Sequence, residues 1–185
     1  MNIAVYSGSF NPLHIGHLAI MEYLSHSKSC DWVYLVVSPK NPLKDSISAD
    51  SGDERYLAAV EAVRRYPKLH VWVDDIELHL EPPQYTIRTL EALKTREPEN
   101  DFSLVMGADN LQGIRRWKEF SRILTEYGVI VYPRKGYDLE GIKAGLLEEC
   151  KDYKIELMDA PTVDISSTEI RDGLASGRDM SEWLM

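Results

Sequence analysis

The chain has 185 residues, of which 44% are hydrophobic, so it is long enough for one sizeable core and short for two. No apolar run approaches the roughly 20 residues that cross a bilayer, and the N-terminus lacks the pattern of an export signal, so we expect a cytoplasmic protein with no membrane partner. The formal net charge of -9 argues against a nucleic-acid partner, and the widely separated Cys30 and Cys150 form no metal or disulfide motif.

The first predicted unit is a strand, a tight loop and a helix. Residues 2–6 (NIAVY) form an apolar, partly β-branched run typical of a buried strand, and residues 7–9 (SGS) break it into a small-residue turn. Pro12 forces the residue before it toward extended geometry. A helix then begins near His14, because the apolar residues that follow have helical spacing: Ile15, Leu18, Ala19 and Leu24.

This unit has the geometry of a phosphate site. The free amides of the first helical turn and the helix dipole favour an anion, and Gly8 lets the backbone approach a ligand closely. His14 and His17 are three residues apart, so they share one face of the first turn, and Gly16 between them leaves room for a nucleotide. We expect the two imidazoles to face one anion; the alternative is that they only cap and pack the helix.

The same stretch carries a family resemblance. Its pattern GxFxPxHxGH resembles the signature of the nucleotidylyltransferase superfamily, on the residues Gly8, Phe10, Pro12, His14, Gly16 and His17. HIGH is also found in class I aminoacyl-tRNA synthetases, and Ser7 stands where many relatives have a second glycine. The resemblance implies a single nucleotidyltransferase domain over residues 1–185, with a Rossmann-like α/β fold: an open, mostly parallel sheet with helices on both faces.

The next part of the chain alternates strands and helices. Residues 32–37 (WVYLVV) and 69–73 predict buried strands. Between them, residues 53–66 predict an amphipathic helix with surface charges, whose inner side is made by Tyr56, Leu57, Val60 and Val63. The polar loop at residues 40–51 carries two lysines, and the resemblance implies that it closes over a triphosphate through Lys44. The alternative is a solvated loop lysine.

An acidic stretch follows the third predicted strand. It contains Asp74, Asp75, Glu77 and Glu81, whose carboxylates could bind a metal. We expect a solvated acidic loop instead, because such loops are common before a helix.

The resemblance narrows at the next helix, which is predicted over residues 86–93 and would present free amides at its start. Its YTxxTL run, followed by a predicted strand, GADNL and a tryptophan, resembles nicotinate mononucleotide adenylyltransferases. That resemblance implies that Thr86 and Trp117 hold the pyridine nucleotide, while a tryptophan at this helical spacing is also common in a core.

The predicted strand at residues 102–106 places Gly107 and Asp109 at the carboxyl edge of the sheet, where open α/β sheets bind ligands. The Asp109 carboxylate could accept hydrogen bonds from ribose hydroxyls or cap the following helix. A further strand at residues 128–132 precedes Arg134, a candidate phosphate contact. A helix at residues 139–150 and a strand at 154–158 follow.

The second motif is ISSTEIR, residues 165–171, in a C-terminal part (about residues 160–185) that we expect to be helical. Its serines and glutamate predict a helix start, whose hydroxyls and amides at Ser166, Ser167 and Thr168 could cradle phosphate with Arg171 one turn later. ISSTxIR resembles the second signature of the family, and the synthetase motif KMSKS is absent. The alternative is a plain capped helix.

The resemblance implies an enzyme that transfers AMP from ATP to nicotinate mononucleotide, giving nicotinate adenine dinucleotide and pyrophosphate in NAD biosynthesis. Catalysis would be positioning and charge stabilisation, since the acceptor phosphate is already a nucleophile. Mg²⁺ would arrive with ATP, so no dedicated metal site is expected. The implied residues are, for catalysis, His14, His17, Lys44 and Arg171; for ATP, Gly8, Ser9, Phe10, His14, His17, Gly107, Asp109, Ser166, Ser167, Thr168 and Arg171; and for the acceptor, Ser9, Lys44, Tyr85, Thr86, Trp117 and Arg134.

Three alternatives stay open. Relatives that use phosphopantetheine, nicotinamide mononucleotide or glycerol phosphate share the first motif, and the YT, GADNL and Trp117 cluster argues against them. A synthetase fragment is opposed by the acidic charge and the missing KMSKS. A non-catalytic nucleotide sensor would keep the pocket but release no pyrophosphate. The expected partners are ATP and nicotinate mononucleotide, and the sequence leaves the oligomeric state open, a homo-oligomer included.

Overall fold

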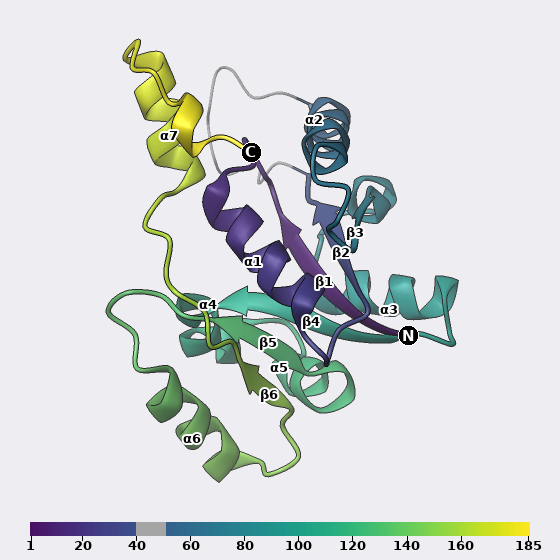
Figure 1. Cartoon of the computed structure of the whole chain (residues 1–185). Helices are drawn as coiled ribbons and strands as arrows, with labels where there is room; N and C mark the ends of the chain where they lie inside the picture. The colour runs from purple at the N-terminus through teal and green to yellow at the C-terminus, as the bar shows by residue number, and fades with distance from the viewer. Residues whose placement is uncertain (40–50) are drawn as a thin grey trace.

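The fold is built on a six-stranded sheet, and each of its strand pairings is parallel (Figure 1). The computed structural model describes residues 1–39 and 51–185. The strands are β1 (Asn2–Gly8), β2 (Trp32–Val37), β3 (Val71–Asp74), β4 (Asp101–Gly107), β5 (Val129–Tyr132) and β6 (Ile155–Leu157). Their order in the sheet is β3-β2-β1-β4-β5-β6, which confirms the predicted open α/β architecture.

The chain order reverses at β1, which pairs with β2 on one side and with β4 on the other. In open parallel sheets, ligands bind outside the carboxyl ends of the strands at such a switch point. The carboxyl end of β1 leads into the GSFNPLH loop, and the carboxyl end of β4 leads into Ala108 and Asp109. The topology therefore brings the first motif and the GAD segment to the same edge.

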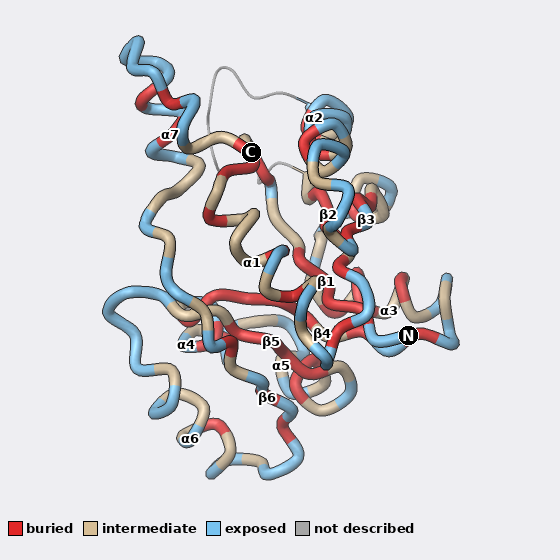
Figure 2. Tube along the Cα trace, viewed as in Figure 1, coloured by how far each residue is buried: buried red, intermediate tan, exposed pale blue. Residues whose placement is uncertain are grey.

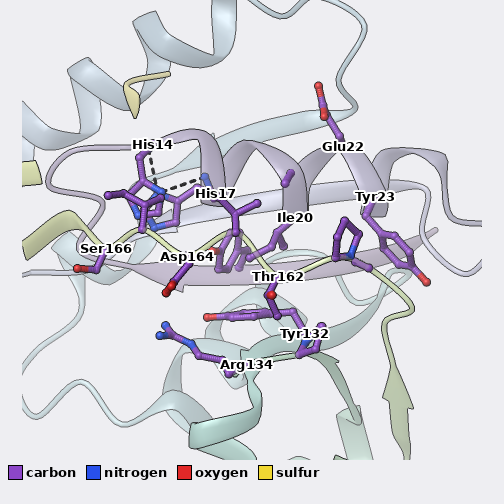
Figure 3. Close-up of a pocket in the computed structure, with 18 of the residues that line it drawn as sticks. His14, His17, Ile20, Glu22, Tyr23, Tyr132, Arg134, Thr162, Asp164 and Ser166 are labelled. Atoms are coloured by element: carbon purple, nitrogen blue, oxygen red, sulfur yellow. Dashed lines mark hydrogen bonds between the residues drawn. The ribbon is translucent and has the colours of Figure 1, made fainter. Parts of the chain in front are cut away.

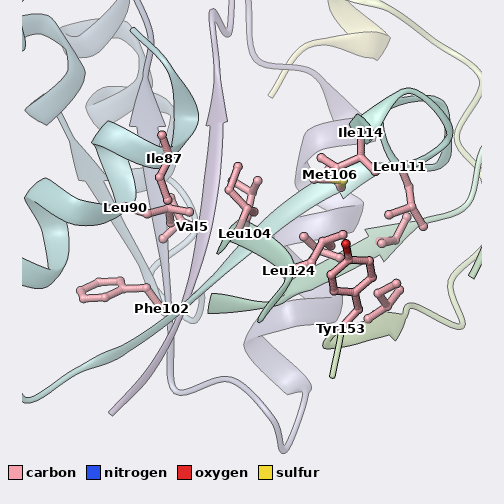
Figure 4. Close-up of a cluster of buried hydrophobic side chains, with 14 of the residues drawn as sticks. Val5, Ile87, Leu90, Phe102, Leu104, Met106, Leu111, Ile114, Leu124 and Tyr153 are labelled. Atoms are coloured by element: carbon pink, nitrogen blue, oxygen red, sulfur yellow. The ribbon is translucent and has the colours of Figure 1, made fainter. Parts of the chain in front are cut away.

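Helices cover both faces of the sheet because the side chains of β1 alternate between two apolar clusters. Ala4 and Tyr6 pack with buried side chains of α1 (Ile15–His26) and α2 (Gly52–Arg64), whereas Val5 packs with Ile87 and Leu90 of α3 (Thr86–Arg96) (Figure 4). Figure 2 shows the buried strands between these layers. The longer helices are α1 (Ile15–His26), α2 (Gly52–Arg64), α3 (Thr86–Arg96), α6 (Leu139–Glu149) and α7 (Ser167–Ala175).

Short helical segments complete the described chain. They are η1 (Ile76–His79), α4 (Ala108–Gln112), η2 (Ile114–Arg116), α5 (Phe120–Arg122), η3 (Ile123–Tyr127) and η4 (Ser181–Trp183). Within residues 1–39 and 51–185, no helix has the length and apolar character that a membrane span needs.

The C-terminal tail returns to the start of α1 after α7, which extends away from the sheet (Figure 1). Leu184 forms an antiparallel bridge with His14, and the terminal Met185 is buried. The Arg65 Nη1 donates a hydrogen bond to the Met185 carbonyl at 3.2 Å. The tail therefore packs against the first motif and α2.

The inner face of α2 agrees with the prediction at Tyr56, Val60 and Val63, which pack against an apolar cluster, but differs at two other positions. Leu57, expected inside, is 64% exposed, and Arg55, expected on the surface, is 2% exposed. The buried positions are Arg55, Ala59 and Ala62, which have the spacing i, i+4 and i+7, so small alanines rather than Leu57 meet the sheet. The buried arginine satisfies polar groups at the sheet edge, as described below.

The prediction of a solvated acidic loop after β3 is wrong for two of its four carboxylates. Asp74 is 3% exposed, and its Oδ2 lies 2.6 Å from Nη2 of Arg96 on α3. Glu77 is 5% exposed and accepts hydrogen bonds from neighbouring hydroxyls. Charges with such partners are tolerated in an interior, and their partners come from distant parts of the chain.

Candidate active site

Two histidines cap the start of α1. His14 is the N-cap residue, and its Nδ1 accepts a hydrogen bond from the Gly16 N–H at 3.1 Å. The Nδ1 of His17 accepts from the His14 N–H, also at 3.1 Å, which completes a capping box (Figure 3). The two rings stack with their centroids 3.7 Å apart. The HIGH sequence therefore builds its own helix cap and fixes both imidazoles.

These hydrogen bonds determine which nitrogen of each ring carries the proton. A neutral imidazole that accepts at Nδ1 carries its proton at Nε2. Burial and the nearby charge of Arg134 lower the pKa of His14 to about 4. Burial, the neighbouring His14 and Arg134 hold the pKa of His17 well below its usual value. Both rings are therefore neutral at neutral pH, and each has one Nε2–H donor.

The loop between β1 and α1 is shaped by the Phe10 ring. Phe10 is 5% exposed, has a left-handed backbone (φ 46°), and packs edge-on against Tyr6 and His17 at centroid distances of 5.3 and 5.1 Å. A Cβ at Gly8 would lie 3.1 Å from the Phe10 ring, and a Cβ at Gly16 would lie 2.9 Å from the His14 ring. Both motif glycines thus give room to an aromatic ring.

A cavity of about 1230 Å³ lies along α1 (Figure 3). Helix α1 forms one wall, and the turn after β5 together with residues 160–167 forms the other. Ligand pockets commonly have volumes of about 300–1,000 Å³, so this cavity has room for a nucleotide. The side chains that carry its chemistry are His14, His17, Tyr132, Arg134, Asp164, Ser166 and Ser167.

Arg134 lines this cavity together with the cationic Lys135 and connects the ends of two strands. Its guanidinium lies 5.9 Å from the centroid of the Tyr132 ring, and its Nε is 3.5 Å from Oδ1 of Asp109. Asp109 follows β4, whereas Arg134 follows β5. Gly107 leaves the space for this carboxylate, because a Cβ there would approach Asp109 Oδ1 to 2.6 Å. An arginine so placed can attract an anion into the cavity.

The second motif touches the first. Ser166 caps α7 and forms a capping box with Glu169. The Ser167 hydroxyl donates to the Pro12 carbonyl at 2.9 Å, and Nη1 of Arg171 donates to the Asn11 carbonyl at 2.6 Å. The N-termini of α1 and α7 consequently lie at one end of the cavity, and the positive ends of two helix dipoles favour an anion there.

Comparison with known proteins identifies the family. A model of the cytidylyltransferase-like family matches residues 5–173. Two curated relatives, each named "probable nicotinate-nucleotide adenylyltransferase", come from Bacteroides fragilis and Flavobacterium johnsoniae. The first is 39% identical over 97% of this chain and 85% of its own, and the second is 37% identical over 100% of this chain and 92% of its own. The chain belongs to the nicotinate-nucleotide adenylyltransferase family.

Solved structures agree on the fold. The nicotinic acid mononucleotide adenylyltransferase of Plasmodium falciparum, complexed with NaAD, aligns with a TM-score of 0.80 at 23% identity and covers 98% of this chain and 87% of its own. A second structure of that protein, complexed with APC, aligns with a TM-score of 0.77 at 22% identity, covering 99% of this chain and 90% of its own. The Rossmann-like adenylyltransferase fold is thereby confirmed.

The predicted adenylyltransferase residues fall into two groups in this structure. His14, His17, Arg134, Ser166 and Ser167 line the cavity. The others do not line it: Gly8, Ser9 and Phe10 in the first loop, Gly107 and Asp109 after β4, and Thr168 and Arg171 on α7. The predicted Lys44 lies outside the described residues.

The residues predicted to hold the pyridine nucleotide do not line this cavity. Tyr85 is 44% exposed and caps α3, which packs on the other face of the sheet, and Thr86 is the first residue of that helix. Trp117 is partly buried against the apolar cluster of the same face. Ser9 is exposed at the sheet edge. Tyr85, Thr86 and Trp117 thus lie apart from the His14 and His17 pair, whereas Arg134, also expected to contact the acceptor, lines the cavity with them.

Three residues near the adenylyltransferase site were missed in the sequence. Tyr6 and Tyr132 line the cavity and contact each other edge-on at 6.2 Å between centroids. Arg55 binds the edge of the sheet: its Nη1 donates to the carbonyls of Ser9 and Ser38 at 2.8 and 2.7 Å. The available signal was the spacing of Arg55 with Ala59 and Ala62, which places it on the inner face of α2.

Proposed function

We propose that this protein transfers AMP from ATP to nicotinate mononucleotide and releases pyrophosphate, forming nicotinate adenine dinucleotide for NAD biosynthesis. The names of its curated relatives support this activity and acceptor. The observation that carries the proposal is the pair of neutral imidazoles, each held with an Nε2–H donor beside Arg134 and two helix N-termini.

The chemistry needs positioning and charge stabilisation. A phosphate oxygen of nicotinate mononucleotide attacks the α-phosphorus of ATP, and the bond from that phosphorus to the β-phosphate oxygen breaks as pyrophosphate leaves. The attacking oxygen is already an anion, so no general base is required. His14 and His17 would donate hydrogen bonds to the α-phosphate oxygens, where charge develops in the transition state. Neutral donors fixed by the backbone need no reorganisation to do so.

The remaining ATP contacts are those that the two motifs and the family resemblance suggest. The amides at Ser166, Ser167 and Thr168, with Lys44 and Arg171, would bind the β- and γ-phosphates, because a helix N-terminus and cations favour phosphate. Asp109 would accept hydrogen bonds from the ribose hydroxyls. Magnesium enters as part of the substrate Mg-ATP, in which the phosphates and water supply its oxygen ligands.

Nicotinate mononucleotide would bind at the start of α3. The N-cap residue Tyr85 makes no side-chain cap hydrogen bond there, so the amides of Thr86 and Ile87 can receive the nicotinate carboxylate or a phosphate, while that of Arg88 donates to the Tyr85 carbonyl. Thr86 is at this helix start, and Trp117 and Ser9 would complete the acceptor site with Arg134 at the reacting phosphate. Two nucleotides would then approach the β1–β4 edge from opposite faces of the sheet.

Pyrophosphate release from Mg-ATP tests the function, run with nicotinate mononucleotide, nicotinamide mononucleotide or phosphopantetheine as acceptor. We expect strong preference for the nicotinate form and a rate lowered about 100- to 1,000-fold in His17→Ala, because a transition-state donor is lost. His79→Ala is the matched control, since that side chain is 70% exposed and pairs with Asp75. If pyrophosphate is released only with another acceptor, the assignment of nicotinate mononucleotide is refuted. If the protein binds ATP but releases no pyrophosphate with any acceptor, it is a nucleotide sensor and not an enzyme.

A further inference from the structure

A buried carboxylate lies at the carboxyl edge of the sheet, outside the cavity. Glu77 belongs to η1, directly after β3, and is 5% exposed. Its Oε1 accepts two hydrogen bonds, from Ser7 Oγ at 2.9 Å and from Thr89 Oγ1 at 3.0 Å. Burying an acid is costly unless such partners compensate for the lost water. The two hydroxyls therefore hold Glu77, and Glu77 in turn holds them together.

The direction of these hydrogen bonds follows from the donors available. A carboxylate only accepts, so the hydroxyls of Ser7 and Thr89 both donate to Glu77. The Ser7 oxygen, 2.9 Å from the Ser38 oxygen, must then accept from Ser38 because its own proton is already used. The chain of hydrogen bonds consequently joins the ends of β1 and β2 to η1 and α3.

The hydrogen bonds of Glu77 with Ser7 and Thr89 fix the position of α3 relative to β1, which apolar packing alone does not fix. Ser7 stands two residues after Val5 on β1, so its side chain faces the α3 layer. Val5, Ile87 and Leu90 share an apolar cluster there (Figure 4), but apolar contacts are non-directional and permit a helix to slide along a strand. Hydrogen bonds at 2.9 and 3.0 Å to one oxygen are directional and restrict that sliding.

We propose that Glu77 is a positioning residue that holds the start of α3 at a fixed distance from the glycine loop after β1. The proposal rests on the proposed function, in which that loop and α1 hold ATP while the start of α3 holds nicotinate mononucleotide. Thr89 lies one turn after Thr86, so the Glu77 carboxylate sets the position of the acceptor site. Transfer requires the attacking oxygen to approach the α-phosphorus to about 3–3.5 Å in line, so a small displacement of α3 slows it.

Four variants test this assignment with three measurements: steady-state kinetics, Mg-ATP affinity without acceptor, and far-UV circular dichroism. Glu77→Ala removes the shared acceptor, and Thr89→Val removes one donor with little change of shape. Glu77→Gln keeps an oxygen that can accept both hydroxyl protons. Glu81→Ala is the matched control, because Glu81 is an exposed acid of the same stretch.

We expect folded Glu77→Ala to lose about 100-fold in kcat/KM for nicotinate mononucleotide, chiefly through KM, because the acceptor site is misplaced. Its affinity for Mg-ATP alone should match the wild type, since the ATP contacts lie on the other face. Glu77→Gln should restore most of the loss. Thr89→Val should raise the same KM by a smaller factor, and it keeps the test decisive if Glu77→Ala does not fold.

Two results would overturn the positioning role. One is a wild-type KM for nicotinate mononucleotide in folded Glu77→Ala or Thr89→Val, which would leave Glu77 a purely structural residue. The other is Glu77→Gln as impaired as Glu77→Ala, which would assign the effect to charge. A wild-type protein that makes no product with nicotinate mononucleotide would instead refute the proposed function, so the two failures are distinguishable.

Discussion

Replacing Arg55 by methionine removes a buried guanidinium and leaves an unbranched apolar side chain in its place. Nη1 of Arg55 donates to the carbonyls of Ser9 and Ser38, at 2.8 and 2.7 Å, which ties the loop after β1 to the end of β2. Hydrogen bonds from a charged group each contribute about 1.5–3 kcal/mol, and part of this gain offsets the desolvation of the guanidinium. We expect the free energy of unfolding of Arg55→Met to fall by about 2–4 kcal/mol.

Urea unfolding followed by circular dichroism measures this change, with Arg64→Met as the control on the same helix. The Arg64 side chain is 74% exposed and makes an ion pair with Glu61, a surface contact typically worth about 0–1 kcal/mol. Arg55→Met should also lower kcat/KM for Mg-ATP, because the Ser9 carbonyl belongs to the loop after β1, which is proposed to hold ATP. If Arg55→Met is as stable as Arg64→Met, the cost of burying the charge cancels its hydrogen bonds, and Arg55 does not stabilise the link between the loop after β1 and the end of β2.

Two further predictions concern the histidine pair. Gly16→Ala should lower kcat about 100-fold, because the new Cβ would sit 2.9 Å from the His14 ring and displace it; a wild-type kcat would contradict the packing of the motif. The second concerns pH. Folding lowers the pKa of His14 to about 4 and that of His17 below its usual value, so between pH 6.5 and about 4 the unfolded chain binds more protons than the folded one. The free energy of unfolding should therefore fall as pH decreases through this window. Urea titrations of the wild type and of His14→Gln/His17→Gln should show a shallower fall in the double variant, and parallel curves would refute the assignment.

The sequence itself was sufficient for most of the architecture. Apolar runs such as residues 32–37 and 102–106 correspond to β2 and β4, because a strand buried on both faces carries a continuous apolar signal. The loop and helix of the first motif were predictable for a similar reason: Gly16, His14 and His17 interact within a single helical turn. Hydrogen bonds and spacings of this kind depend only on residues close together in the sequence, so they can be predicted from it.

The charged residues of the interior were not placed in this way, although the spacing of Arg55 with Ala59 and Ala62 was a signal for one of them. Arg55, Asp74 and Glu77 occur in polar stretches that resemble solvated surface. Their burial depends on partners far along the chain: the Ser9 carbonyl for Arg55, the Arg96 guanidinium for Asp74, and the Ser7 and Thr89 hydroxyls for Glu77. A charge becomes stable inside a protein only when the tertiary fold supplies those partners.

The sequence by itself predicted the residues that we propose for phosphate chemistry: the histidine pair, and the serines and arginine of the ISSTEIR motif. Only the tertiary structure decided how they combine. It brings Ser167 and Arg171 against the loop at Asn11 and Pro12, and it places Thr86 and Trp117 with the opposite face of the sheet. The reason is topological, since a parallel sheet gathers the ends of β1, β4 and β5 at one edge, while the two sides of that edge are covered by different helices.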